Sequence, residues 1–412
     1  MPTDPKKKAQ TKAKSQAKKQ VKKAAKKNPG IVIALVAIVV VIVVVAVVLY
    51  LKVPAVNQAV NNIIHPESAS VDNGTNNSGN NGNANSNLVL GEGELKVHFI
   101  DVGQGDCIFI QFPDGKDMLI DCGNETKTSL PSETLTYLQT INTDNDIDYL
   151  MLTHTDKDHV SFLDEIIDAF DIFNIYMPNI KAVPGTDSTQ KAALQDKINK
   201  LDSEKLALFT DPDTVNTIVY AEFFWRALSE PQCTIHLNVD DDDKTNSIII
   251  KDDANTYSLI FYCMTAEQWA STNLGDAYKV NAVSPIGILE YNGKRIVLTG
   301  DSNKNNEPNV AKRIGHIDCD VLKVAHHGSD TSSLEVFIDA VTCEYAVFCC
   351  GTGNKYGHPT QVAINSVLKY CTTIYRTDLN GTIVLTVNGE GTINFTMDDN
   401  TPTQEQERVG AK

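Results

Sequence analysis

The chain has 412 residues, of which 42% are hydrophobic, and a formal net charge of −16. This length excludes a small scaffold that depends on disulfides or metal for its stability, because several hundred residues can bury a large core. The negative charge argues against broad electrostatic adhesion to nucleic acid, which needs Lys and Arg to neutralise phosphates. The nine cysteines show no CxxC spacing, so we expect mostly buried small apolar side chains rather than a zinc ribbon or a full disulfide framework.

Residues 1–30 form a Lys-rich arm with 11 lysines and one aspartate, which leaves a net charge of −26 on the rest of the chain. The arm is followed by residues 31–51, an apolar segment without a charge. A helix of this length rises about 30 Å, which matches the hydrocarbon core of a bilayer. We therefore predict one transmembrane helix in the lipid bilayer. A cleaved signal peptide is the alternative, although its apolar stretch is usually shorter.

The distribution of lysines predicts the orientation of this helix. Only Lys52 lies between the apolar segment and Lys96, whereas the preceding arm is rich in lysine. The positive-inside bias then places the N-terminus in the cytoplasm and, after a single pass through the cell membrane, the rest of the chain outside. Residues 52–90 are rich in Asn, Gly and Ser and predict a disordered, flexible linker. Residues 91–400 form the expected globular domain, and residues 401–412 form a polar tail.

The globular domain begins with two apolar runs on either side of Pro113-Asp114-Gly115, which predict a β-hairpin. Helical and strand patterns alternate after it. We expect helices at Ser132–Thr140 and Phe162–Phe170, and strands at Ile147–Thr153, Ile286–Tyr291, Arg295–Thr299, Val321–Ala325, Tyr345–Cys349, Thr373–Tyr375 and Thr382–Val387. This order predicts an α/β fold with two mixed sheets covered by helices. The stretch Lys181–Lys244 is interpreted as a polar, irregular insertion near the site, with one amphipathic helix at Lys191–Leu208.

The densest chemistry lies at the end of the strand Ile147–Thr153, in the motif HTDKDH. In a tight loop, His154, Asp156 and Asp158 can converge while His159 turns towards a second cation, which suits two ions in one cavity. A solvated polar loop with an acidic helix start fits this motif equally well when the motif is taken alone.

Three further segments contain potential ligands. Asp301 follows LTG, the pair His326 and His327 follows LKVA, and His358 lies in YGHPT. Each is an ordinary loop residue when taken alone. Their appearance together at successive strand ends predicts one shared site.

The order of the motifs resembles the metallo-β-lactamase superfamily, and within it the C-terminal hydrolase domain of the ComEC competence proteins. The matching segments, between Leu95 and Phe395, are HFIDVGQGDCIFI, the turn Asp121-Cys122-Gly123, LTHTDKDHVSFL, LTGD, LKVAHHGS, NKYGHPT and YRTDLNG. The resemblance implies an αββα sandwich with the site along one edge of the two sheets. It also implies a hydrolase that activates water on one or two metal ions.

The resemblance implies a set of ligands for two divalent metal ions. His154 and Asp156 would bind one ion, Asp158 and His159 the other, Asp301 would bridge them, and His358 would be a further ligand of the second ion. Many members of the superfamily have a histidine where this chain has Asp156. Carboxylate-richer sites tolerate harder ions, so manganese competes with zinc here.

The resemblance also implies roles beside the ions. His326 and His327 occupy the place where related phosphodiesterases have a histidine near the scissile phosphate; we favour His327, followed by Ser329, and leave His326 open. Asp158 and Asp301 would hold the attacking hydroxide. Asp121 would orient the ligand loop through hydrogen bonds.

The superfamily's usual third histidine has no clear match in this sequence. Asn281 and Ser284, which ComEC-like domains share, occupy the equivalent place near metal or substrate. His236 is the alternative ligand, but its setting in CTIHL favours a strand.

These expectations combine into a membrane-anchored, extracellular, metal-dependent hydrolase of phosphodiesters, with extracellular DNA as the favoured substrate. The charge of −26 after the arm opposes DNA binding, so a small phosphoester or a nucleotide is the alternative substrate. A non-catalytic metal-binding surface module is the alternative from another class. No protein partner is predicted.

Overall fold

The computed structural model describes residues 90–182, 189–207, 214–215, 217–237, 247–265, 268 and 280–398. All of them belong to Gly82–Lys412, the second of two compact units. The predicted arm, transmembrane helix and polar tail, and nearly all of the predicted linker, lie outside the described residues. Among the described residues, no helix combines the length and apolar character needed to cross a bilayer.

The first of the two large sheets has eight strands in the order β17-β16-β1-β2-β3-β4-β5-β8. The strands are β1 (Leu95–Phe99), β2 (Cys107–Gln111), β3 (Asp117–Cys122), β4 (Asp146–Met151), β5 (Asp171–Met177), β8 (Thr234–Leu237), β16 (Ile383–Val387) and β17 (Ile393–Met397). Pairing is antiparallel from β17 to β3 and parallel from β3 to β8. The predicted hairpin is confirmed as the β2–β3 pair.

The second sheet has seven strands in the order β15-β14-β13-β12-β11-β10-β9. The strands are β9 (Ser247–Lys251), β10 (Tyr257–Tyr262), β11 (Ile286–Tyr291), β12 (Lys294–Leu298), β13 (Cys319–Lys323), β14 (Cys343–Phe348) and β15 (Thr373–Arg376). Pairing is antiparallel from β9 to β12 and parallel from β12 to β15. The expected architecture of two mixed sheets is therefore confirmed.

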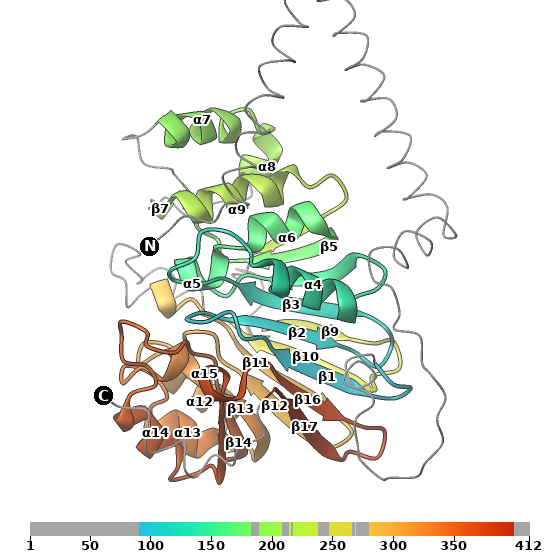
Figure 1. The fold of residues 1–412 in the computed structure, drawn as a ribbon, viewed down its shortest axis with the longest axis vertical. Helices are drawn as coiled ribbons and strands as arrows, with labels where there is room; N and C mark the ends of the chain where they lie inside the picture. Colours follow the sequence, from blue (N-terminus) through green and yellow to red (C-terminus); the bar gives the residue numbers. More distant parts are fainter. Residues whose placement is uncertain are drawn as a thin grey trace, which may run out of the picture. The chain divides into compact units, whose positions relative to one another are not determined.

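Helices cover the outer faces of both sheets, so the domain has four layers (Figure 1). The first sheet carries α4 (Ser132–Ile141), α5 (Lys157–Val160), α6 (Leu163–Ala169) and α9 (Ile218–Ser229); the second carries α12 (Glu307–Ile314), α13 (Glu335–Val341) and α14 (Gln361–Val367). Strand β2 shows that both faces of the first sheet are buried. Cys107 and Phe109 pack with the helices, whereas Ile108 and Ile110 pack between the two sheets. Alternate side chains point to opposite faces, and here both faces are apolar.

The interpretation of residues 181–244 as an irregular insertion is wrong for much of the stretch. Helix α9 buries Phe223 and Phe224 completely in the core of the first sheet, and β8 extends that sheet beside β5. The remaining described elements of this stretch are β6 (Lys181–Ala182), β7 (Thr214–Val215), α7 (Thr189–Ile198) and α8 (Ser203–Ala207). The apolar residues of α9 are flanked by polar ones, which masked the core helix in the sequence. His236 lies in β8, which confirms the expected strand.

The single amphipathic helix expected at Lys191–Leu208 is instead divided into α7 and α8. Chain direction changes between them at Asp202, whose Oδ1 accepts a hydrogen bond of 2.6 Å from Glu204 N. An aspartate that accepts a backbone proton two residues ahead competes with helical bonding and begins a new helix. Leu208 lies outside the described residues.

The cysteines follow the expectation with one exception. Six of the seven described cysteines that are not in a disulfide are buried. The exception is a disulfide between Cys343 at the start of β14 and Cys371 after α14. Both belong to the core between the second sheet and its helices.

Candidate metal centre

The candidate residues gather where strands of both sheets end. The loop after β4 carries His154 and leads into α5 with His159, Asp301 follows β12, and His327 follows β13 in the short helix η1 (Ala325–Gly328). The carboxyl ends of parallel strands lie on one edge of a sheet, where open α/β folds place their ligands. Asp106 joins them from the loop before β2, at the start of its antiparallel strand.

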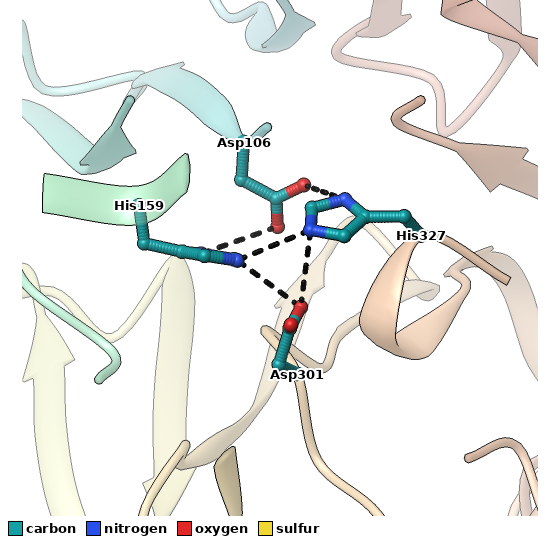
Figure 2. Close-up of side chains that lie close together, drawn as sticks. All are labelled: Asp106, His159, Asp301 and His327. Atoms are coloured by element: carbon teal, nitrogen blue, oxygen red, sulfur yellow. Dashed lines mark hydrogen bonds and ion pairs between the residues drawn. The ribbon is translucent and has the colours of Figure 1, made fainter. Parts of the chain in front are cut away.

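Four buried side chains form the centre of this site (Figure 2). One ligand atom from each of Asp106, His159, Asp301 and His327 lies within 4.8 Å of the other three. His159 Nε2 is 3.2 Å from Asp301 Oδ1 and 3.3 Å from His327 Nε2. Two imidazole nitrogens and a carboxylate oxygen thus converge on one point, which is the donor set of a divalent metal ion.

A second group of donors lies near Oδ2, the other carboxylate oxygen of Asp301. His154 Nε2 is 3.8 Å from Asp301 Oδ2 and 3.7 Å from Asp156 Oδ2, and it is buried without a hydrogen-bond partner among the described residues. These distances are too long for hydrogen bonds. They suit ligands of a shared cation, because donors about 2.1 Å from a tetrahedral ion lie about 3.4 Å apart. The residues present therefore fit divalent metal.

The three buried histidines share one orientation, with Nδ1 hydrogen-bonded to the protein and Nε2 in the site. His159 Nδ1 donates to Asp121 Oδ2 at 2.8 Å, and His327 Nδ1 donates to Cys349 O at 2.8 Å. His154 Nδ1 lies 3.1 Å from Thr153 Oγ1, which donates its own proton to Asp121 Oδ2 at 2.7 Å. Such partners leave the Nε2 lone pair available to a metal.

Asp121 occupies the supporting position that the resemblance implied. Its two carboxylate oxygens accept hydrogen bonds from Thr153 N, Thr153 Oγ1 and His159. It is fully buried at a positive φ of 55°, a conformation that carries strain for a residue with a side chain. One aspartate thereby orients the ligands at both ends of the HTDKDH motif.

Asp106 and Lys323 are the site residues that the sequence analysis missed. Lys323 is fully buried, forms an ion pair with Asp106 and donates to Gly300 O at 3.1 Å. Burial alone would raise the pKa of Asp106, but Lys323, His327 and His159 together outweigh it and lower that pKa. A lysine within the apolar run VLKVA was the available signal.

The electrostatics of the centre reflect an excess of carboxylates. Burial opposes the charged form of His159, yet Asp301 and Asp121 raise its pKa well above the usual value. Burial also opposes the charged form of His327, but the neighbouring carboxylates Asp301 and Asp106 raise the pKa of His327 to about 10. The carboxylates therefore favour positive charge at their centre, which a cation satisfies as well as a proton does.

A cavity of about 420 Å³ opens onto the centre. Among its lining residues are Asp156, Asp158, Asn281, His326 and His358. Asp158 Oδ2 is 3.3 Å from His327 Nε2, and Asn281 Nδ2 donates to Asp301 Oδ2 at 3.1 Å. Most of the predicted residues therefore lie at the centre or on the wall of its cavity.

His326 and His358 form a pair on the cavity wall, with ring centres 5.6 Å apart. His326 Nε2 is 3.5 Å from Asp301 Oδ2, and the side chain is 21% exposed. Burial lowers the pKa of His326, and it lowers that of His358 to about 4. Among the described residues, the buried cluster consists of Asp106, His159, Asp301 and His327 and does not include His358.

The remaining predicted residues lie behind the site or away from it. Ser284 Oγ accepts from Asp301 N at 3.2 Å and lies 3.3 Å from His154 Nδ1. Ser329 hydrogen-bonds to Thr331 at 2.9 Å in the loop after η1. His236 stacks on Tyr176 and bonds to Asn174 in the first sheet, and so is not brought to the centre.

Residues 100–226 match the model of the metallo-β-lactamase superfamily. The chain is 26% identical to ComE operon protein 3 of Bacillus subtilis (strain 168) over 304 residues, which are 70% of this chain and 33% of that protein. It is 42% identical to Competence protein ComA of Neisseria gonorrhoeae over 92 residues, which are 22% of this chain and 13% of that protein.

Residues 100–226 thus resemble the metallo-β-lactamase superfamily, and the chain is similar in sequence to ComE operon protein 3 and to Competence protein ComA. The chain spans about a third of the length of ComE operon protein 3. Among solved structures, the metallo-beta-lactamase fold protein YhfI from Bacillus subtilis is 11% identical with a TM-score of 0.37, covering 74% of this chain and 100% of that one.

Proposed function

We propose that this chain is a metal-dependent phosphodiesterase that acts on DNA at the outer face of the cell membrane. The observation that carries the proposal is the convergence of His154, His159 and His327 on the two oxygens of Asp301, each with its Nε2 in the site. Three imidazoles and a central carboxylate at an open cavity suit catalysis better than a closed structural site.

Two divalent ions, zinc or manganese, fit the two groups of donors. His154 and Asp156 would hold one ion and His159 the other, with Asp301 between them. The geometry favours His327 as a further donor to the second ion, because its Nε2 lies 3.3 Å from both His159 Nε2 and Asp158 Oδ2. The role of His358 as a ligand stays a prediction; its Nδ1 is buried without a partner among the described residues.

Bound divalent ions would supply an activated water and neutralise the phosphate charge. The protein would supply the proton transfers. Asp158 faces the cavity and can accept the proton of the attacking water, while His326, with Nε2 on the cavity wall, can protonate the leaving oxygen. Asn281 donates to Asp301 and keeps that carboxylate in position.

The surroundings of the cavity favour a polynucleotide over a small phosphoester. A second cavity of about 520 Å³ shares Gln104, Glu125 and Tyr356 with the first. Lys157 lines the first cavity, and Lys127 and Lys355 line the second. The latter two lie beside the carboxylates of Asp101, Glu125 and Asp378 in the second cavity, and all three lysines offer contacts for phosphates on either side of the scissile bond.

Tyr356 supplies the aromatic surface that single-stranded nucleic acid uses. It is 46% exposed, and its ring stacks on His358 with centres 5.5 Å apart. A base can stack on such an exposed ring without sequence preference. The name of one relative, Competence protein ComA, agrees with DNA as the substrate. A small phosphoester or nucleotide is the second candidate, because the first cavity alone could hold it.

The proposed location outside the cell rests on the apolar segment 31–51 and on the disulfide. Disulfides persist in oxidising compartments and are rare in the cytoplasm, so Cys343–Cys371 favours the outside. Protease added to intact cells should remove the globular domain and leave a short protected N-terminal fragment. Survival of the domain until the cells are lysed would place it in the cytoplasm.

The test of activity uses the full chain in detergent with manganese or zinc. Hydrolysis of bis-p-nitrophenyl phosphate and of end-labelled single-stranded DNA should both occur, and Asp301→Ala should show neither. Hydrolysis of bis-p-nitrophenyl phosphate and nucleotides without DNA cleavage would support the small phosphoester. Stoichiometric metal without any hydrolysis would support a non-catalytic module.

A further inference from the structure

Two cysteines face each other directly beneath the metal centre. Cys107 begins β2, Cys122 ends β3, and the two are paired across the strands. Gly123 N donates to Asp106 O at 3.1 Å, which makes Cys107 and Cys122 a pair without hydrogen bonds between them. The register shifts between Cys107 and Ile108, so the pair lies next to a β-bulge; the Cα atoms of a regular pair of this kind are about 4.5 Å apart, within the range that a disulfide bridges.

The sulfur atoms are closer than two separate thiols would be. Cys107 Sγ lies 2.8 Å from Cys122 Sγ, and both side chains are fully buried. This separation is well inside the van der Waals contact of two sulfurs and approaches the disulfide bond length of about 2.05 Å. Their surroundings are apolar residues of the first sheet and its helices. The backbone therefore already holds the two sulfurs in position for a bond.

We propose that Cys107 and Cys122 form a second disulfide, which fixes the aspartates of the metal centre. In the first step, one cysteine thiolate attacks an external disulfide, such as oxidised glutathione or that of a thiol oxidase, and releases one external thiolate. The other cysteine then attacks the mixed disulfide and releases the second. Two electrons pass to the external disulfide and the two cysteine protons to solvent. Since folding buries both sulfurs, the exchange precedes the packing of α5 and α6.

The position of the bond determines its effect. Asp106 and Asp121 immediately precede the two cysteines, and each contacts a buried histidine: Asp106 is 3.3 Å from His327 Nδ1 and Asp121 is 2.8 Å from His159 Nδ1. Linking the strands at this level restrains both aspartates, and through them both imidazoles. The disulfide therefore serves metal affinity, whereas Cys343–Cys371, in the core of the second sheet, does not touch the centre.

The covalent state is tested by mass spectrometry on the full chain refolded in detergent with reduced and oxidised glutathione. After alkylation under denaturing conditions and digestion, we expect one peptide pair joined through Cys107 and Cys122 and lacking two hydrogen atoms, beside the pair joined through Cys343 and Cys371. Complete alkylation of Cys107 and Cys122 in refolded protein would overturn the proposal. This measurement needs no activity, so it stands apart from the proposed hydrolysis.

The effect on metal is tested with matched variants. Cys107→Ser/Cys122→Ser should raise the Kd for manganese by about tenfold or more, the scale seen when supporting groups of a metal site are lost, while Cys343→Ser/Cys371→Ser leaves it unchanged. If the first variant fails to fold, Cys343→Ser/Cys371→Ser can be reduced with a phosphine and its Kd compared before and after. Equal affinity in both states would contradict the proposed role.

The state of Cys107 and Cys122 in the cell also tests the proposed location. The disulfide needs oxidising conditions, and these depend on the proposed function's placement of the domain outside the cell. Cells are treated with an alkylating reagent before lysis, and the same peptides are measured. A linked pair supports both proposals. A pair that is linked after refolding but alkylated from cells supports the capacity for the bond and contradicts the outward location.

Discussion

The histidines on the floor of the cavity differ from those on its wall in burial and in hydrogen bonding. On the floor, His154, His159 and His327 are almost fully buried, and each Nδ1 has a protein partner. On the wall, His326 and His358 are partly exposed, and burial lowers the pKa of both. A histidine whose Nδ1 is hydrogen-bonded to the protein presents a fixed Nε2 lone pair to a metal, whereas a partly exposed histidine can exchange protons with a substrate.

Asp301→Ala should give the largest effect, because this carboxylate contacts both groups of floor donors. We expect loss of metal and of hydrolysis to background, since the remaining imidazoles lose the charge that holds cations. Metal stoichiometry by mass spectrometry and bis-p-nitrophenyl phosphate hydrolysis measure the two losses. The fold should persist, as judged by circular dichroism, because Asp301 makes no part of an apolar core. Full metal content in this variant would contradict the shared site.

Separate substitutions of the adjacent histidines test the comparison most directly. His326→Ala should keep its metal while turnover falls about 100-fold or more, the scale of an acid–base group. His327→Ala should lose metal. Metal content and kcat are measured for both variants. The reverse pattern would exchange the two roles, and unchanged activity in both would reject the assignment of this motif.

Lys355→Glu tests whether the wall extends the site towards a polymer. Lys355 lines the second cavity and pairs with Glu125. We expect about tenfold weaker binding of single-stranded DNA and a smaller salt dependence, with a lesser effect on bis-p-nitrophenyl phosphate. Lys369→Glu is the matched control, because Lys369 also pairs with a glutamate but lines neither cavity. Equal losses on both substrates would point to a small phosphoester.

Glu307 should have the smallest effect on catalysis, because its contribution is to stability. Burial raises the pKa of Glu307 to about 7, although its carboxylate accepts bonds from Ser333 N and Leu334 N at 2.7 and 2.8 Å. The folded state then binds the proton more tightly than the unfolded state, whose pKa is about 4.3. The stabilisation is complete below that value and is lost as pH rises through 7.

Chemical denaturation between pH 5 and pH 8 measures this loss, which is on the order of 3 kcal/mol from the shift in pKa. The free energy of unfolding of Glu307→Gln should fall less over the same range, because glutamine does not titrate. Parallel pH profiles of the two proteins would show that Glu307 is ionised in the folded state. The loop that Glu307 holds carries Ser332, whose Oγ lies 3.4 Å from His326 Nδ1. As pH rises, the cavity wall around His326 should therefore lose its structure before the floor with His154, His159 and His327.

The strand ends were predictable because the sequence shows both the strands and the residues directly after them. HTDKDH, LTGD and LKVAHHGS each place ligand types directly after an apolar run, and the carboxyl ends of parallel strands meet at one edge. The hairpin at Pro113-Asp114-Gly115 was equally local, since a turn signal between apolar runs specifies it. By contrast, α9 escaped notice because a short apolar run among polar residues does not show whether a core lies against it.

Only the tertiary structure brings together residues whose partners are distant in the chain. Asp106 precedes β2 and Lys323 ends β13, and only the packing of the two sheets joins them as an ion pair. Likewise, a sequence shows the position of a histidine in the chain but not which of its two ring nitrogens faces the metal centre. That choice depends on Asp121, Cys349 and Thr153, whose positions behind the rings are set by packing of the two sheets and not by any local pattern.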